Sequence, residues 1–167
     1  MAHLSLFELN SLIKRQLQDH LETNYWVVAE ISEMRENPKG HCYMELIEKE
    51  GNFIQAKIRA NIWAYTYRSL KYQFSKATGT DLKSGMRALF NVSINFHEVY
   101  GMSLTVNDID PNFTIGERSR LKEETIRKLK EEEYLDLNKR LELPAVPQNI
   151  AIISSKTAAG YGDFLDQ

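Results

Sequence analysis

The N-terminal part of the chain carries the apolar pattern of an amphipathic helix. Apolar residues recur there at steps of three and four positions, which places them on one helical face. They are Leu6, Leu9, Leu12, Ile13 and Leu17. Ser5 and Glu8 have the spacing of a capping box, in which each side chain bonds the backbone N–H of the other residue. The sequence therefore predicts a helix that starts after Ser5 and packs its apolar stripe against a partner surface, with Lys14 and Arg15 on its solvated side.

Farther along, apolar and polar residues alternate with a period of two, as expected for β-strands that are buried on one face. The predicted strands cover residues 25–32, 41–49, 53–63, 86–99 and 102–109. A longer connection of helical character links the third strand to the fourth. Five strands with such a connection follow the order of an OB-fold, a small barrel. The predicted fold class is mainly β with added helices, with residues 1–112 forming the N-terminal helix and a five-stranded OB-fold barrel.

The alternation also predicts which side chains point into this barrel. The inward face of the second strand is expected to hold Cys42, Met44 and Leu46. The inward face of the third strand is expected to hold Ile54, Ala56, Ile58, Ala60 and Ile62. Tyr43 on the second strand and Lys57 and Arg59 on the third strand should then face outward together.

The stretch from Phe53 to Thr80 contains no aspartate or glutamate, although the whole chain has a net charge of -2. Its cations are Lys57, Arg59, Arg68, Lys71 and Lys76. Its rings are Phe53, Trp63, Tyr65, Tyr67, Tyr72 and Phe74. Cations that can hold phosphates, alternating with rings on which bases can stack, are typical of proteins that bind single-stranded nucleic acid. The alternative is a solvated strand face followed by core contacts, which would be Tyr65, Tyr67, Leu70 and Phe74.

The leading candidate contacts to nucleic acid are Lys57, Arg59 and Tyr43. Further candidates on the same side, in the first loop and at the strand ends, are Arg35, Lys39, His41 and Trp63. A structural role is the alternative for His41, because a single histidine on a strand is more often structural. The second and third strands of an OB-fold, with the loops beside them, commonly bind oligonucleotides. Topology and residue chemistry therefore point to one surface.

Composition narrows the possible classes of protein. Of the 167 residues, 43% are apolar and 26% are charged, which is ordinary for a folded domain. The single cysteine, Cys42, excludes an internal disulfide and a cysteine-cluster metal site, and no metal or other cofactor is predicted. No apolar run reaches the roughly 20 residues that span a bilayer, and no signal-peptide pattern opens the chain, so we expect a cytoplasmic protein. A net charge near zero argues against a protein that coats nucleic acid indiscriminately.

The composition changes beyond Asn112. Charged residues with high helix propensity fill residues 117–137, and we interpret residues 113–147 as a linking helix and a linker bounded by prolines. The apolar run of residues 149–154 is typical of a strand buried in a parallel sheet. The small, hydroxyl-rich turn after it suits a phosphate group, although it lacks the glycines of a P-loop; its residues are Ser155, Lys156 and Thr157. One such strand cannot form a sheet, so residues 148–167 are expected to be the truncated start of a further domain.

Four segments of the chain resemble, in order, the large subunit of exodeoxyribonuclease VII. They are VAEIS from Val28, GHCYMEL from Gly40, KIRANIW from Lys57 and IAIISSKTAAGYGDFL from Ile150. The resemblance implies an enzyme that hydrolyses single-stranded DNA from its ends into oligonucleotides and that binds the strand with an OB-fold. It also implies assembly with copies of a small helical subunit in the cytoplasm. The chain departs from the family pattern at Ala29, Met44 and Ala158.

The same resemblance implies a catalytic role for Asp163, which matches a carboxylate associated with catalysis in the family. The family's other catalytic residues, an arginine, a histidine and a second aspartate, would follow Gln167. A carboxylate at this place can orient or activate water. The residues alone favour a helix cap at Asp163 instead. We therefore expect this chain to bind single-stranded DNA without cutting it.

Two interpretations from other classes stay open. The first is a stand-alone OB-fold module that binds tRNA or another single-stranded nucleic acid and has no hydrolytic role. The second is an interaction protein whose helix from Glu117 to Leu137 pairs with a partner.

Overall fold

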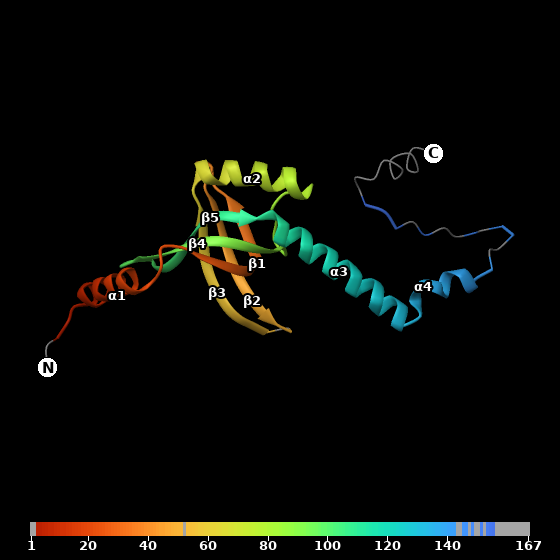
Figure 1. The fold of residues 1–167 in the computed structure, drawn as a ribbon, viewed down its shortest axis with the longest axis horizontal. Coiled ribbons are helices and arrows are strands. Elements are labelled where there is room, and N and C mark those ends of the chain that lie inside the picture. Colours follow the sequence, from red (N-terminus) through yellow and green to blue (C-terminus); the bar gives the residue numbers. More distant parts are fainter. Residues whose placement is uncertain are drawn as a thin grey trace. The chain divides into compact units, whose positions relative to one another are not determined.

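A computed structural model of the chain describes residues 3–51, 53–142, 145, 146, 148, 151 and 153–155. These residues fall into two compact units, divided between Glu124 and Thr125. The first unit contains a β-barrel with its helices. The second contains the end of the last long helix and the short helical turns after it. Figure 1 shows the course of the chain through these elements.

The elements follow the order that the sequence pattern predicts. The helices are α1 (Leu6–His20), α2 (Ala64–Thr78), α3 (Pro111–Glu131) and α4 (Tyr134–Leu137), followed by the 3₁₀ turn η1 (Asn138–Arg140). The strands are β1 (Tyr25–Glu36), β2 (Cys42–Glu50), β3 (Phe53–Ile62), β4 (Arg87–His97) and β5 (Gly101–Asp110). The predicted helical connection between the third and fourth strands is α2.

The five strands close into one barrel in the order β1-β2-β3-β5-β4. Neighbouring strands are antiparallel except for β3 and β5, which run parallel and pair Ala60 with Leu104 and Asn61 with Thr105. β1 has two neighbours because its first half pairs with β4 and its second half pairs with β2. This order confirms the predicted OB-fold barrel with helices before and after it.

The apolar faces of the strands fill the barrel, and α2 covers one end of this core. The buried cluster includes Cys42, Met44 and Leu46 of β2, Phe90 and Val92 of β4, and Tyr67, Leu70 and Phe74 of α2. Each fully buried large apolar side chain contributes roughly 1.5–3 kcal/mol. The free energy of burial therefore fixes which face of each strand turns outward.

Tyr65 was grouped with the core contacts of α2, and this prediction is wrong. Its side chain is 90% exposed. The reason is helical phase: Tyr67, Leu70 and Phe74 follow one another at steps of three and four residues, and Tyr65 lies on the opposite face.

The capping box of α1 is present as predicted. The Ser5 hydroxyl accepts a hydrogen bond from the Glu8 backbone N–H at 3.2 Å, and Glu8 Oε2 accepts one from the Ser5 backbone N–H at 2.7 Å. The hydrogen bond from the Ser5 backbone N–H, and to a smaller extent the Ser5 side chain, lower the pKa of the Glu8 carboxyl. No residue of α1 is buried, however, so the described residues do not provide the expected partner surface for its apolar stripe.

The β2–β3 hairpin extends past the part of the barrel that other strands cover. Ile54 and Ala56 were expected to point into the core, but both are exposed, Ile54 by 54% of its surface. The physical reason is that β5 pairs with β3 only at Ala60 and Asn61, so the first half of β3 has a neighbour on one side alone. The inward face there has nothing to pack against.

α3 begins directly where β5 ends. Its first residue is Pro111, a position that proline favours because it needs no N–H donor in the first helical turn. The Asp110 carboxylate accepts a hydrogen bond from the Asn112 backbone N–H at 2.9 Å. None of the helices in the described part of the chain is both long and apolar enough to cross a bilayer.

Several predictions about the C-terminal residues fall outside the described residues. These are the two prolines that bound the linker, three of the six residues of the predicted strand in residues 149–154, and the residues Lys156, Thr157, Ala158 and Asp163. The assignment of residues 148–167 to a further domain stays a prediction.

The stability of the barrel should fall as the pH rises above about 9. Burial raises the pKa of the Cys42 thiol from 9.0 to about 11 and that of the Tyr67 hydroxyl from 10.0 to about 12. In the unfolded chain both groups lose their protons at ordinary values, so above about pH 9 the unfolded state binds fewer protons than the folded state. The urea midpoint of unfolding should therefore be constant between about pH 7 and 9 and decline between about pH 9 and 12.

The variant Cys42→Ala separates the two groups. It should lower the midpoint at neutral pH, because it leaves a cavity, and should reduce the decline between about pH 9 and 11. An alkaline decline of equal steepness in the variant and the parent chain would contradict the assignment to Cys42.

Candidate nucleic-acid interface

One row of outward-facing side chains crosses all five strands of the barrel. In register order the row consists of Arg35, Tyr43, Asn61, Thr105 and Ser93. Except for the exposed Glu36 at the end of β1, their neighbours along each strand pack in or against the core, so these side chains turn outward. We call this set the outward row. Arg35 and Tyr43 line one groove on the barrel surface, and the other three residues line a second groove.

The first groove, which we call the arginine groove, lies over β1, β2 and β3 and has a volume of about 740 Å³. Arg35, Tyr43 and Arg59 line it, together with Glu33 and Glu45. Among the described residues, neither Arg35 nor Arg59 forms an ion pair. Two guanidinium groups with five N–H donors each are therefore available beside an exposed ring, and this combination can hold phosphates and stack a base.

Lys57 lies on the same outward face, but its charge is already engaged. Its Nζ is 2.7 Å from Oε2 of Glu45, and the Lys57 side chain is 55% exposed while that of Glu45 is 19% exposed. Strand register places Glu45 directly beside Arg59 and diagonally from Lys57, and diagonal neighbours remain within reach of long side chains. The ion pair thus leaves Arg59 as the free cation of β3 in this groove.

The second groove, which we call the amide groove, lies between α1 and the outward faces of β3, β5 and β4, with a volume of about 680 Å³. Amide and hydroxyl groups dominate its strand side: Asn61, Ser93, Asn95, Ser103 and Thr105. The rings in its lining are Trp63, Phe96, His97 and Tyr100. Neutral donors and acceptors of this kind can bond the edges of unpaired bases.

The Asn61 amide is a candidate base contact at the centre of the outward row. Its Nδ2 is buried and has no hydrogen-bond partner among the described residues. Buried donors without partners are rare because they lose hydration without compensation. By contrast, Asn95 Nδ2 donates to Thr105 Oγ1 at 2.9 Å, which holds both side chains in place.

Two polar residues of α1 bind the turn between β4 and β5 at the edge of the amide groove. Lys14 Nζ lies 3.0 Å from Glu98 Oε1, and Asn10 Nδ2 donates to the Glu98 carbonyl at 2.8 Å. Two hydrogen bonds lower the pKa of the Glu98 carboxyl. The larger effect comes from the backbone N–H of Glu98 itself, and the second from the side chain of Lys14. Lys14, which we interpreted as solvated, therefore positions one wall of the groove.

His41 has a structural contact as well as a place at the interface. Its Nδ1 accepts a hydrogen bond from the Ala64 backbone N–H at 3.1 Å, at the start of α2. Trp63 lacks a side-chain cap for this helix, so His41 supplies the acceptor. The His41 ring also packs against the Trp63 ring. The two rings are nearly perpendicular, with 5.1 Å between their centroids, and this T-shaped geometry is one that aromatic rings favour.

The turn between β1 and β2 is ordered by Asn37. Its Oδ1 accepts hydrogen bonds from the backbone N–H groups of Lys39 at 3.0 Å and His41 at 2.9 Å. Gly40 takes a positive φ of 82° in this turn, which favours glycine. The exposed Lys39 side chain therefore projects from a fixed turn close to His41.

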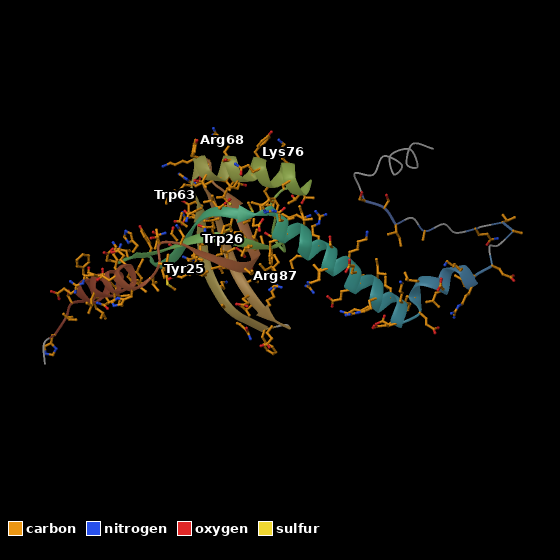
Figure 2. The ribbon with its side chains drawn as sticks, viewed as in Figure 1. Tyr25, Trp26, Trp63, Arg68, Lys76 and Arg87 are labelled. Carbon is orange, nitrogen blue, oxygen red and sulfur yellow. The ribbon has the colours of Figure 1, made fainter. Side chains whose placement is uncertain are left out.

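The structure brings most of the predicted contacts together and separates them into two groups. Arg35, Tyr43 and Arg59 share the arginine groove, whereas Trp63 lines the amide groove with His41 packed against it. The pairing of Tyr43 with Asn61 joins the two groups. Figure 2 shows Trp63 where β3 gives way to α2. Arg35 belongs to β1 and not to the loop in which it was expected.

Sequence reasoning missed the half of the surface that β4 and β5 provide. The alternation in β4 does place Ser93 and Asn95 on the face away from the core. What the sequence did not reveal is the parallel pairing of β3 with β5, which sets Thr105 beside Asn61. In the described part of the chain, no group of three or more histidine, cysteine, aspartate or glutamate side chains is placed to hold a metal ion.

The barrel and this surface define a class of nucleic-acid-binding domain. Residues 4–110 match the family described as OB-fold nucleic acid binding domain, and the chain belongs to that family.

Comparison with curated proteins shows similarity to exodeoxyribonuclease 7 large subunits. The one from Deinococcus radiodurans is 32% identical over 96% of this chain and 40% of its own length. Those from Oceanobacillus iheyensis and Bacillus subtilis are each 26% identical over 98% of this chain, and over 33% and 34% of their own lengths. These matches confirm the resemblance seen in the four sequence segments. The chain spans about a third to two fifths of the length of these relatives.

Removing the His41 ring should weaken the start of α2. His41→Ala deletes the acceptor for the Ala64 N–H, and loss of a helix cap typically costs about 1 kcal/mol. We expect a lower urea midpoint and faster hydrogen exchange of the first amides of α2. Because the backbone N–H donates to Nδ1, NMR of the neutral ring should find its proton on Nε2.

His20→Ala is the matched control, because His20 is exposed at the end of α1. It should leave the exchange of the α2 amides unchanged. If His41→Ala also leaves this exchange unchanged, His41 does not cap α2.

Proposed function

We propose that this chain is the single-stranded DNA-binding part of an exodeoxyribonuclease VII large subunit and that it holds the strand along the outward row. The observation that carries the proposal is the row itself, since it joins a groove with two unpaired arginines to a groove lined by amides and rings. The nucleic-acid-binding family of the barrel and the names of its relatives support the proposal.

A single strand suits this surface better than a duplex. Tyr43 and Trp63 can stack only on bases that are not stacked in a double helix. The Asn61 amide likewise needs a base edge that is free of a pairing partner. Stacking is worth roughly 1–3 kcal/mol per base and tolerates any sequence, so the expected ligand is single-stranded DNA without strong sequence preference.

The electrostatic contribution is expected to be modest. The free cations along the proposed path are Arg35 and Arg59, with Lys39 on the adjoining turn. Each phosphate neutralised on a single strand adds about 0.7 to the slope of log affinity against log salt. Two or three contacts give binding that depends on salt but lacks the steep dependence of strongly basic proteins.

In the whole protein we propose that the bound strand is hydrolysed from its ends. Phosphodiester hydrolysis needs an oriented water, cations around the phosphate and an acid for the leaving oxygen. Asp163 is our candidate for orienting the water, and Ser155, Lys156 and Thr157 are candidates for a phosphate-binding turn. Of these four, the described residues include Ser155, which is exposed. Because Asp163 alone supplies neither the cations nor the acid, we expect this chain to bind DNA without cutting it.

The proposal includes a small helical partner subunit and a cytoplasmic location. Both rest on the resemblance to exodeoxyribonuclease VII, and the large-subunit name of the relatives supports an enzyme of more than one subunit. The fold leaves a stand-alone tRNA-binding or RNA-binding role as the competing interpretation, so the binding experiment includes RNA.

Changes at Arg59 and Tyr43 should weaken binding of a labelled single-stranded oligonucleotide of about 20 nucleotides. Arg59→Gln should lower the salt slope by about 0.7, and Tyr43→Ala should reduce the affinity by roughly 5- to 150-fold, the equivalent of one lost stacking contact. Fluorescence anisotropy at several salt concentrations measures both. DNA should bind more tightly than RNA of the same sequence, and a gel should recover the DNA uncut.

Arg87→Gln is the matched control. It removes the same charge from β4, where Arg87 lies beside Glu30 of β1 and pairs with Glu117 at 3.8 Å. It should leave the affinity unchanged within about twofold. Equal losses for Arg59→Gln and Arg87→Gln would mean that net charge, and not the outward row, determines binding.

Glu45→Gln should strengthen binding. The change removes a negative charge from the arginine groove and releases Lys57, which then becomes a third cation for the strand. Since ion pairs at such partly exposed positions are worth about 0.2–1 kcal/mol, we expect a gain in affinity of roughly 1.4- to fivefold, measured with the same oligonucleotide.

Glu48→Gln removes the same charge from the exposed part of β2 and is not in the lining of either groove. Its affinity should stay close to that of the parent chain. A weaker complex with Glu45→Gln would show that the Glu45–Lys57 pair positions the strand and does not compete with it.

A further inference from the structure

α2 carries a second surface on the side opposite the core. Its buried face consists of Tyr67, Leu70 and Phe74. Directly opposite, at steps of three and four residues, stand Tyr65, Arg68, Tyr72 and Lys76, which form one stripe roughly 16 Å long. We call them the α2 stripe. Figure 2 shows Arg68 and Lys76 on the side of α2 that is turned away from the barrel.

The α2 stripe has positive charges without partners. α2 contains no aspartate or glutamate, and its three cations are Arg68, Lys71 and Lys76. Lys71 is engaged, because its Nζ lies 3.8 Å from Glu36 and 5.6 Å from the ring centroid of Tyr67. Within the described part of the chain, Arg68 and Lys76 take part in no ion pair.

Two acidic residues lie in a groove to one side of the stripe. Glu36 and Asp81 line a groove of about 370 Å³ along the flank of α2, which Arg68 and Tyr72 border. Neither carboxylate is within ion-pair distance of Arg68. The outer edge of α2 therefore keeps its positive charge for a ligand.

The rings of the stripe are exposed. Tyr65 is 90% and Tyr72 is 68% exposed, and Arg68 stands between them. Along the helix the order is ring, cation, ring, cation, which combines stacking surfaces with phosphate-binding groups. A solvated helix face needs no such pair of tyrosines.

The α2 stripe is continuous with the interface on the barrel. Trp63 is the N-cap residue of α2, lines the amide groove and is 51% exposed. Tyr65 follows two residues later at the start of the helix. A strand that leaves the amide groove over Trp63 therefore reaches Tyr65 first and can continue along the outer side of α2.

We propose that the α2 stripe is a second binding surface for single-stranded nucleic acid and that it extends the path of a strand held on the barrel. This proposal rests on the proposed function above. Arg68 and Lys76 bind phosphates, and Tyr65 and Tyr72 stack on bases. Tyrosine and arginine are also common in protein interfaces, where lysine is depleted; the alternation of rings with unpaired cations and the continuity with Trp63 favour nucleic acid here.

Oligothymidines of two lengths test the proposal on the whole 167-residue chain. One of about 8 nucleotides fits the site size of a single OB-fold, and one of about 30 nucleotides is long enough to reach beyond it. Arg68→Gln with Lys76→Gln, and separately Tyr65→Ala with Tyr72→Ala, should each weaken binding of the long oligonucleotide about tenfold. Both should leave the short one unchanged within about twofold. For the charge variant, the salt slope of the long oligonucleotide should fall by about 1.4.

The control variant is Arg15→Gln with Lys122→Gln, which removes two exposed charges from α1 and α3. It should not change the affinity for either oligonucleotide, and thermal unfolding should confirm that every variant is folded. Equal affinity of the α2 variants and the parent chain for the long oligonucleotide would overturn the proposal, as would equal losses for both lengths. Arg59→Gln and Tyr43→Ala should weaken both lengths; if they weaken neither, the proposed function itself fails.

Discussion

The parallel contact between β3 and β5 is the interaction on which the rest of the structure depends. It closes the barrel, although it consists of just two register pairs, Ala60 with Leu104 and Asn61 with Thr105. Closure pairs the backbone groups that a sheet edge would leave open. It also brings the outward faces of β4 and β5 beside those of β2 and β3. The same contact therefore builds the core on one side and a continuous polar surface on the other.

Local charge balance explains how a chain of net charge -2 can present the proposed phosphate-binding surface. The chain has many acidic residues, but most of the ion pairs that they form lie outside the arginine groove. In the arginine groove, Glu45 forms an ion pair with Lys57, whereas Arg59 forms none among the described residues. This arrangement limits the number of phosphates that the barrel can hold, and since each contributes to salt dependence, ring stacking by Tyr43 and Trp63 has to supply much of the proposed affinity.

Sequence alone was sufficient for the features that depend on local periodicity. The alternation in β2 identified Cys42, Met44 and Leu46 as buried because burial acts on a strand through its period of two. The helical phase that exposes Tyr65 was also present in the sequence, but its spacing from Tyr67 was misjudged. Contacts between distant segments were out of reach. The exposure of Ile54, the capture of Lys57 by a glutamate on another strand and the meeting of Asn61 with Thr105 all depend on strand register.

α2 illustrates how one element can serve the core and the surface together. Its buried side must match the end of the barrel, and this requirement fixes the rotation of the helix about its axis. Once that rotation is fixed, the residues on the outer side point in a defined direction, and Trp63 at the N-cap marks where this side begins. His41 adds a second constraint at the same place, because it accepts from the first amide of α2 and packs on Trp63. The packing that stabilises the barrel therefore also fixes the direction in which the outer face of α2 points.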